Sequence, residues 1–494
     1  MRRIVLLAAF WIVASAHVGS PNVVFDGNAG PYPVRVIVQP PNVVPGLAEI
    51  IVRVNASDVQ RVMIRPVFWR TGVAGAPRAD EAKPVAGETR LYSGQLWLMS
   101  RGAYSVYVSV DGARGAGTAI VPVTSLATAR LGMSRPLAAI LIALAVFLFA
   151  GLVTIVRAAA GEAVLPPGET VDASARRRAN WFALIATPIF ALILVGGAKW
   201  WNSVDANYRR TMYRPPAVDA EVRGHELLLR VHDTAPFRSI IAPVIPDHGK
   251  MMHLFLIEAG SHARLFHLHP VQTDSLRFAV SAAGLPKGMY RVFGDLALEN
   301  GMSQTVTTTL NFPGDTAEAI HGGDFEKTDD SWWPLCCNQV GTSDSRPVNI
   351  AHGYTMRWTG GNTPIVAQQA VDLRFEVRDD HNEIARLLPY LGMAAHAVVL
   401  SADESVFVHL HPMGTISTAA QQAFVARDRG DSTSSGRLHV AADTTPMTMQ
   451  MDGHLDFPYE FPKAGRYRIW VQVRPPYAQV LTGAFDIDVR AKTH

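Results

Sequence analysis

The sequence predicts an all-β protein of three immunoglobulin-like (Ig-like) sandwich domains, with two transmembrane α-helices between the first and second. Short β-rich runs separated by turns, two long uncharged apolar stretches and a repeated histidine pattern support this prediction. The 494 residues correspond to about three domains at ~150 residues each. Charged residues make up 18% of the chain, against roughly 25% in typical soluble proteins, which favours membrane segments among ordinary domains.

The N-terminus has the pattern of a secretory signal. Arg2 and Arg3 precede an apolar run from Ile4 to Val13, and Ala14-Ser15-Ala16 provides a small-residue cleavage motif. We therefore expect residues 1–16 to be a signal peptide and His17 to be the mature N-terminus. The alternative is an uncleaved anchor.

Residues 17–135 are expected to form an extracytoplasmic β-sandwich. Alternating and β-branched residues are typical of half-buried strands, and turn dipeptides such as Asp111-Gly112 separate them. The strands that we expect are Val34–Val38, Glu49–Val54, Val62–Trp69 and Tyr104–Val110.

Two stretches, 136–156 and 181–200, are expected to be transmembrane helices. Both contain long uncharged runs able to cross ~30 Å of hydrocarbon, and Trp200 and Trp201 suit the membrane interface. A buried helix of a soluble domain is the alternative for the shorter second stretch. The signal peptide sets the expected orientation, with residues 157–180 as a cytoplasmic loop and both flanking regions outside the cytoplasm, in the periplasm or at the cell surface.

Two further sandwiches are expected at 217–313 and 347–490, joined by a linker at 314–346. They share an internal repeat. A run that contains His253 leads to the motif His267-Leu268-His269-Pro270, and a run that contains His396 leads to His409-Leu410-His411-Pro412. Each motif is followed by a closing strand with a Gly-x-Tyr-Arg pattern, which begins at Gly288 and Gly465.

The histidines of each repeat are candidate metal ligands. Residues two apart on a strand share a face, so each His-x-His pair points the same way. In the first hairpin, a three-residue turn around Gly260 predicts His253 opposite His267. In the second, His396 lies opposite His409 or His411, depending on the turn. Neighbouring side chains across a hairpin lie ~5 Å apart at Cβ, close enough for three imidazoles to share one ion.

Methionines flank both clusters and favour copper as the metal. Imidazole binds copper, zinc and nickel, whereas thioether sulfur selects Cu(I), so the mixture predicts copper as Cu(I) or Cu(II). The alternative is that the histidines are hydrogen-bonded structural residues and the methionines fill the core. The flanking methionines are Met251, Met252, Met393 and Met413, and a weaker candidate group consists of Met447, Met449, Met451 and His454.

The block from Asp247 to His253, the two His-Leu-His-Pro motifs and the closing strands resemble YtkA-like domains, which are extracytoplasmic β-sandwiches similar in style to CopC-type copper carriers. The resemblance covers 217–313 and 347–490, and faintly 30–125. It implies copper binding or delivery at the matching histidines, His253, His267, His269, His396, His409 and His411.

Two further features stand apart from the repeats. We expect His17, once freed by cleavage, to bind Cu(II) through its α-amine and imidazole together, and the sequence resembles CopC-like proteins in starting with such a histidine. Cys336 and Cys337 are adjacent and cannot staple separate elements, and we expect them to be inert thiols or a vicinal disulfide.

No catalytic residues are predicted. The sequence contains no G-x-S-x-G, P-loop or H-E-x-x-H motif, and neither cysteine has the flanking histidines of a multicopper oxidase. A net charge of +3 gives no reason to expect nucleic acid as a partner. We therefore expect a non-enzymatic, membrane-anchored copper-binding protein for copper storage, sensing or transfer. It would hold a partly exposed ion that a copper-accepting protein captures. The alternative is a metal-free scaffold that binds a protein partner or assembles a membrane complex.

Overall fold

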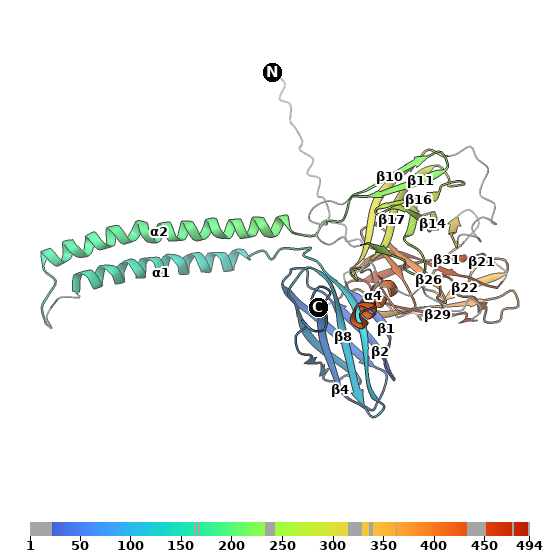
Figure 1. Cartoon of the computed structure of the whole chain (residues 1–494), viewed down its shortest axis with the longest axis horizontal. Coiled ribbons are helices and arrows are strands. Elements are labelled where there is room, and N and C mark those ends of the chain that lie inside the picture. Colours follow the sequence, from blue (N-terminus) through green and yellow to red (C-terminus); the bar gives the residue numbers. More distant parts are fainter. Residues whose placement is uncertain are drawn as a thin grey trace, which may run out of the picture. The chain divides into compact units, whose positions relative to one another are not determined.

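The computed structural model divides into two compact units, Met1–Leu126 with Arg214–His494 and Ala127–Tyr213. About 48% of the chain is β-strand, and the described residues contain three helices. Figure 1 shows the strands gathered into packed sheets and two of the helices as a long hairpin. The structure describes residues 22–162, 165, 168–232, 243–314, 329–334, 339–361, 363–431, 451–476 and 479–492.

The N-terminal sheets pack face to face around an aliphatic core. Inward residues such as Val36, Ile50 and Val106 are fully buried, because alternation along each strand sends every second side chain to the same face. The four strands that the sequence predicts are confirmed in β2, β3, β4 and β8, although β4 ends at Phe68, one residue before the predicted end at Trp69. One sheet has the order β1-β2-β3-β7-β6 and the other β5-β4-β8-β9. The strands are β1 (Val23–Ala29), β2 (Tyr32–Gln39), β3 (Gly46–Val54), β4 (Val59–Phe68), β5 (Asp80–Glu81), β6 (Lys83–Pro84), β7 (Leu91–Leu98), β8 (Gly102–Gly112) and β9 (Gly115–Ser125).

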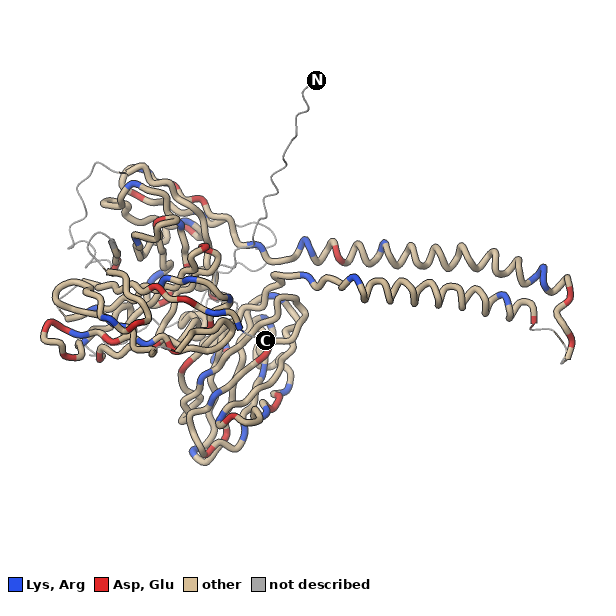
Figure 2. Tube along the Cα trace, turned by 180° about the vertical axis from the view of Figure 1, so that it is seen from behind, with Lys and Arg blue, Asp and Glu red and all other residues tan. Residues whose placement is uncertain are grey.

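The second unit is a helical hairpin of α1 (Arg135–Glu162) and α2 (Ala173–Arg210), which run side by side in Figure 1. Both are long and apolar enough to cross a membrane. Figure 2 shows that charged residues concentrate toward the ends of the hairpin. The helices extend beyond the expected spans, so most of the expected loop 157–180 is helical. Asp172 caps α2 by accepting a hydrogen bond from the backbone nitrogen of Ala175.

The sheets that follow the hairpin contain the first histidine motif. One sheet has the order β10-β11-β16-β15, and the other β12-β17-β13-β14-β19, with β18 also paired to β17. The edge strand β19 comes from the stretch that we expected to be a linker. The strands are β10 (Val218–Arg223), β11 (Glu226–Val231), β12 (Val244–Ile245), β13 (His253–Glu258), β14 (Arg264–Leu268), β15 (Val271–Asp274), β16 (Arg277–Ser281), β17 (Gly288–Leu298), β18 (Ser303–Phe312) and β19 (Ser331–Pro334).

The C-terminal sheets repeat part of this plan. The order β27-β26-β30-β31 matches β14-β13-β17-β18, so in each repeat the strand that precedes the His-x-His strand lies between that strand and the closing strand. A second sheet has the order β21-β22-β24-β29. The elements are β20 (Val340–Thr342), β21 (Val348–Ala351), β22 (Tyr354–Trp358), β23 (Ile365–Val366), β24 (Ala370–Arg378), β25 (Arg386–Leu387), β26 (His396–Ser401), β27 (Phe407–Leu410), α4 (Thr418–Arg429), β28 (Met451–Asp452), β29 (His454–Glu460), β30 (Gly465–Val473) and β31 (Leu481–Arg490).

The two histidine-bearing sheets pack against each other. A buried cluster joins Phe255 and Phe293 of one sheet to Phe407 and Trp470 of the other, and the rings of Phe293 and Phe407 stack with centroids 4.1 Å apart. Strands β13 and β26 are consequently buried on both faces. This interface places the two histidine motifs next to each other.

Candidate metal centre

A tight turn precedes the first histidine-bearing strand of each repeat, β13 or β26. Asp247 and Lys250 exchange two backbone hydrogen bonds, as do Tyr390 and Met393. The two middle residues of both turns have positive φ, which is the type I′ geometry. Gly249 and Gly392 supply the second of these positions without the cost that a side chain adds. The turns bring a backbone carbonyl, that of Asp247 or Tyr390, next to the first histidine of the strand.

The hairpin registers are the same in both repeats. Leu254 pairs with Leu268, which sets His253 across from His269, and Ala397 pairs with Leu410, which sets His396 across from His411. The second register is one of the two that the sequence allowed. The predicted pairing of His253 with His267 is wrong, because five residues, 259–263, connect the strands instead of three.

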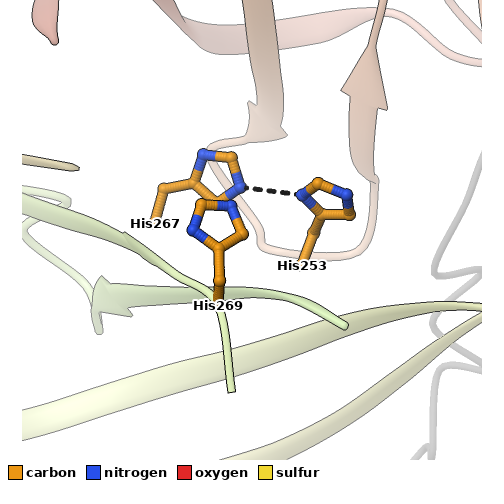
Figure 3. A group of neighbouring side chains, drawn as sticks. All are labelled: His253, His267 and His269. Carbon is orange, nitrogen blue, oxygen red and sulfur yellow. Dashed lines mark hydrogen bonds between the residues drawn. The ribbon is translucent and has the colours of Figure 1, made fainter. Parts of the chain in front are cut away.

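The first triad consists of His253, His267 and His269, whose rings lie close together in Figure 3. Nδ1 of His253 lies 3.2 Å from Nε2 of His267. Each outward nitrogen contacts an acceptor: Nε2 of His253 lies 3.1 Å from the Asp247 carbonyl, Nδ1 of His267 2.9 Å from Oε1 of Gln472, and Nδ1 of His269 2.9 Å from Asp330. One nitrogen of each ring is therefore left to face the interior of the cluster.

The second triad, His396, His409 and His411, has the same arrangement. Nδ1 of His396 lies 3.0 Å from Nε2 of His409. The outward nitrogens again contact acceptors. Nε2 of His396 lies 3.1 Å from the Tyr390 carbonyl, Nδ1 of His409 3.4 Å from the Asp295 carboxylate, and Nδ1 of His411 3.3 Å from the Ile416 carbonyl. In each triad the three ligand nitrogens lie within 4.8 Å of one another.

The inward Nε2 atoms of His269 and His411 are buried, and neither has a hydrogen-bond partner among the described residues. Their Nδ1 atoms face a carboxylate and a carbonyl, respectively, both of which accept a proton. The proton of each neutral ring therefore sits on Nδ1, and the inward Nε2 carries a lone pair. A buried polar atom left unpaired costs about 1–3 kcal/mol, and a bound metal ion would remove this cost.

The two triads form one cluster. We expected a separate site in each domain, but the rings of His253 and His409 lie 5.2 Å apart and those of His267 and His409 5.7 Å apart. His248 is a seventh member, with its ring 4.9 Å from that of His411 and its Nε2 3.4 Å from the hydroxyl of Thr418. The cluster spans the interface between the two domains.

Burial keeps the six histidines of the two triads neutral. It lowers the pKa of His253, His267, His396 and His409 well below the usual histidine value, and nearby histidines lower it further. Burial also lowers the pKa of His269, although Asp330 opposes the shift, and it lowers the pKa of His411 to about 4. Burial raises the pKa of Asp295 to about 7. Neutral imidazole is the form that binds a metal, so the rings are ready to bind at neutral pH.

The flanking methionines occupy core and turn positions. Met252 is fully buried in the apolar core and Met251 packs against the same core. Met413 packs against the N-terminal core, and its sulfur accepts a hydrogen bond from Thr418. Met393 closes the turn at Tyr390. The structure thus groups the six predicted histidines, whereas the methionines occupy packing and turn positions.

The weaker candidates lie elsewhere. Met451 packs against the C-terminal core, and His454 is 60% exposed beside Glu376 and Asp452. The remaining candidates, together with the signal peptide, lie outside the described residues: His17, Cys336, Cys337, Met447 and Met449.

The sequence analysis missed the residues that hold the outward nitrogens. Asp295 and Gln472 stand seven residues after Gly288 and Gly465, at equivalent places in the two closing strands. Extending the repeat by a few residues would have found this pair. Asp330 had no comparable signal, because it precedes β19 in a stretch without periodicity.

The arrangement suits metal binding. Six neutral imidazoles, each with one nitrogen oriented by an outer acceptor, have the pattern of metal-ligating histidines. An all-imidazole set suits copper, zinc, iron or nickel, of which copper binds most tightly in the usual affinity order of divalent ions.

Residues 349–491 match a protein-family model described as a domain of unknown function (DUF8832). No curated protein matches the chain. Among solved structures, an engineered protein is 18% identical with a TM-score of 0.14, and 17% of each chain is covered. The E. coli alpha-2-macroglobulin is 10% identical with a TM-score of 0.20, covering 96% of this chain and 23% of that one. SGBP-B from a xyloglucan utilization locus in Bacteroides uniformis is 8% identical with a TM-score of 0.18, covering 94% and 99%.

The chain therefore spans 17% and 23% of the length of the first two proteins. These TM-scores are too low to support any functional argument, so function must be argued from the site itself.

Proposed function

We propose that this protein is a membrane-anchored, extracytoplasmic metal-binding protein that holds copper in the histidine cluster. The observation that carries the proposal is the pair of buried, unpartnered Nε2 atoms of His269 and His411, one at the equivalent position in each triad. Without a metal the fold bears the cost of both atoms, and with a metal both become ligands.

Copper is proposed because the ligands are imidazoles and copper heads the affinity order for such sites. The sulfur argument from the sequence is set aside, because the methionines near the cluster pack in cores or turns. Zinc is the competing metal, and the test below separates the two.

Burial of the ligands favours a retained metal over one that is exchanged rapidly. The side chains of His269 and His409 are 2% and 5% exposed, which favours a buried ion over a partly exposed one. Direct capture by a partner requires an accessible ion, so transfer to a copper-accepting protein would need the interface to open. Among the predicted roles of storage, sensing and transfer, storage is therefore favoured, and the protein is proposed to be a non-enzyme.

The remaining parts of the proposal are the anchor and the domain family. The two apolar helices would hold the protein in the bilayer, with the sandwiches outside the cytoplasm. The three sandwiches would be related Ig-like domains, and the last two would be similar to YtkA-like and CopC-like copper carriers.

The test is metal analysis of the full chain purified in detergent, after loading with copper or zinc and removal of loosely bound metal. We expect copper to be retained and to resist competition by zinc. The variant with His269→Ala and His411→Ala should retain little, whereas a variant with His381→Ala should bind like the wild type because that side chain is 83% exposed. Wild-type protein that retains neither metal would refute the proposal.

A metal-free scaffold is the second candidate. The ring contacts of 3.0 and 3.2 Å are short enough to be hydrogen bonds between histidines, which would favour a structural cluster. In that case the His269 and His411 variants would lose thermal stability but no metal would be found in either protein.

A further inference from the structure

We infer that the cluster holds two metal ions rather than one, and that each ion's site depends on the other domain for its ligand orientation. This inference rests on the proposed metal-binding function and deepens it. The centre would be dinuclear, with three imidazoles for each ion.

The nitrogen atoms divide by domain. Among the described residues, two groups of possible ligands meet the 4.8 Å limit, one made of His253, His267 and His269 and the other of His396, His409 and His411. Two nitrogens that each lie ~2 Å from one copper or zinc ion are at most ~4 Å apart, so each group would hold one ion after a small inward shift of its rings. Each group contains one unpartnered Nε2, and a single ion in either group would leave the other unpartnered.

The two ions would lie close together. His253 contacts rings of both triads, because its centroid lies 5.2 Å from that of His269 and 5.2 Å from that of His409. With no protein layer between the triads, the ions would share one buried pocket.

A carboxylate stands behind each triad. Asp330 contacts Nδ1 of His269 at 2.9 Å, and Asp295 lies 3.4 Å from Nδ1 of His409. Two cations in one buried pocket repel each other, so compensation at each site is needed for both to bind. One carboxyl group in contact with each triad fits one ion in each triad.

The outer contacts cross the interface in both directions. Gln472 neighbours His396 in the sheet but contacts His267 of the first triad. Asp295 neighbours His253 but contacts His409 of the second triad. Each domain therefore orients a ligand of the other domain.

Tyr390 adds a third link between the triads. Its carbonyl faces Nε2 of His396 at 3.1 Å, while its hydroxyl oxygen lies 3.2 Å from Nδ1 of His267. The hydroxyl donates its proton to the carbonyl of Asp329 at 2.9 Å, so its oxygen accepts from His267. One residue thereby contacts a ligand of each site, and loading of one site would preorganise the other.

The test uses the full chain in detergent, titrated with copper against a chelator of known affinity. We expect two ions per chain. When the protein is loaded with Cu(II), electron paramagnetic resonance should detect fewer unpaired spins than copper atoms, because neighbouring ions couple. One ion per chain, or a full complement of independent spins, would overturn the inference and leave the proposed function intact. No bound copper would instead refute the proposed function.

Interdependence is tested with Gln472→Leu, which removes a contact to His267 and changes no ligand. Losing an orienting partner typically costs 10–100-fold in metal affinity. We expect a loss of this size at the first site and weaker binding at the second. His269→Ala should likewise weaken the remaining site, whereas retention of one ion at wild-type affinity would contradict interdependence. Tyr390→Phe, which keeps the carbonyl, should show the smallest loss, and circular dichroism confirms that each variant is folded.

Discussion

The N-terminal sandwich and the histidine-bearing pair of domains use similar strands in different surroundings. Strand β3 alternates strictly, with Ile50 and Val52 buried and Glu49 and Arg53 exposed to solvent. Strand β26 has no exposed residue along its length. One face of β26 packs on its own core and the other packs on the neighbouring domain.

This difference explains why the histidines can form a buried centre. On a sheet with one solvated face, a His-x-His pair would lie in water and remain available for protonation. Here the same pair lies on a face that the second domain covers, so burial and six converging rings shift the chemistry toward neutral ligands.

Acidification should have the largest effect, because it should destabilise the histidine-bearing sheets more than the N-terminal sandwich. Each buried histidine stays neutral in the fold but gains a proton when unfolded, so the unfolded state binds more protons below pH ~6.5 and stability falls as pH decreases. Each of the six histidines lowers the free energy of unfolding by up to about 1.4 kcal/mol for every pH unit below ~6.5. This loss stops where the pH reaches the pKa of that histidine in the folded protein, which is about 4 for His411. Asp295, with its raised pKa, opposes this trend between pH ~4 and 7, but it is one group against six.

Hydrogen exchange at a series of pH values checks this prediction in the metal-free protein. Strands β13 and β26 should lose protection below pH ~6.5, while β3 and β8 should keep theirs, because no histidine occurs between residues 18 and 224. Equal loss of protection in both regions would contradict the prediction. Bound copper should move the loss to lower pH.

Removing an inward ligand should have the next largest effect. His267→Ala and His409→Ala delete equivalent ligands of the two triads, and each should lower copper affinity by more than the ~100-fold that an outer partner contributes at most. Chelator competition measures both losses, with His381→Ala as the exposed control. If only one of the two variants lost copper, the triads would not be equivalent.

Removing the charge of either carboxylate that contacts a triad should lower copper affinity by less than removing an inward ligand. Asp330→Asn and Asp295→Asn remove a charge and keep the shape, and we expect each to lower copper affinity ~10–100-fold. The loss should be greater for Asp330, whose contact is 2.9 Å, than for Asp295 at 3.4 Å. If the loss of copper affinity in the same competition assay were greater for Asp295→Asn, the contact distance would not predict how much each carboxylate contributes to copper binding.

Met252→Leu should have the smallest effect. The side chain is buried in an apolar core, and a volume-conserving change there typically costs less than ~1.5 kcal/mol. Thermal unfolding should show this small loss, and copper binding should not change. A fall in copper affinity would instead make the thioether a ligand.

Much of the fold could be predicted from the sequence. The alternation of Val34–Val38 and Glu49–Val54 was sufficient for strands. The duplicated His-Leu-His-Pro motif selected four of the six histidines, and the repeated run before each motif selected the other two. The turn length of the first hairpin was not predictable, because Gly260 fits a three- or a five-residue connection. The uninterrupted run Leu254–Ile257 did signal burial on both faces, but it could not identify the covering partner.

The six candidate histidines could be selected from the sequence alone, because side-chain periodicity along a strand is a local property. The meeting of the two triads was decided only by the tertiary structure. Packing of Phe293 on Phe407 fixes the distance between the sheets, and only then do Asp295 and Gln472 reach the histidines of the opposite domain. These contacts join residues 114 positions apart (Phe293 with Phe407, Asp295 with His409) or 205 apart (His267 with Gln472). They depend on how two surfaces fit together, and no local pattern encodes that fit.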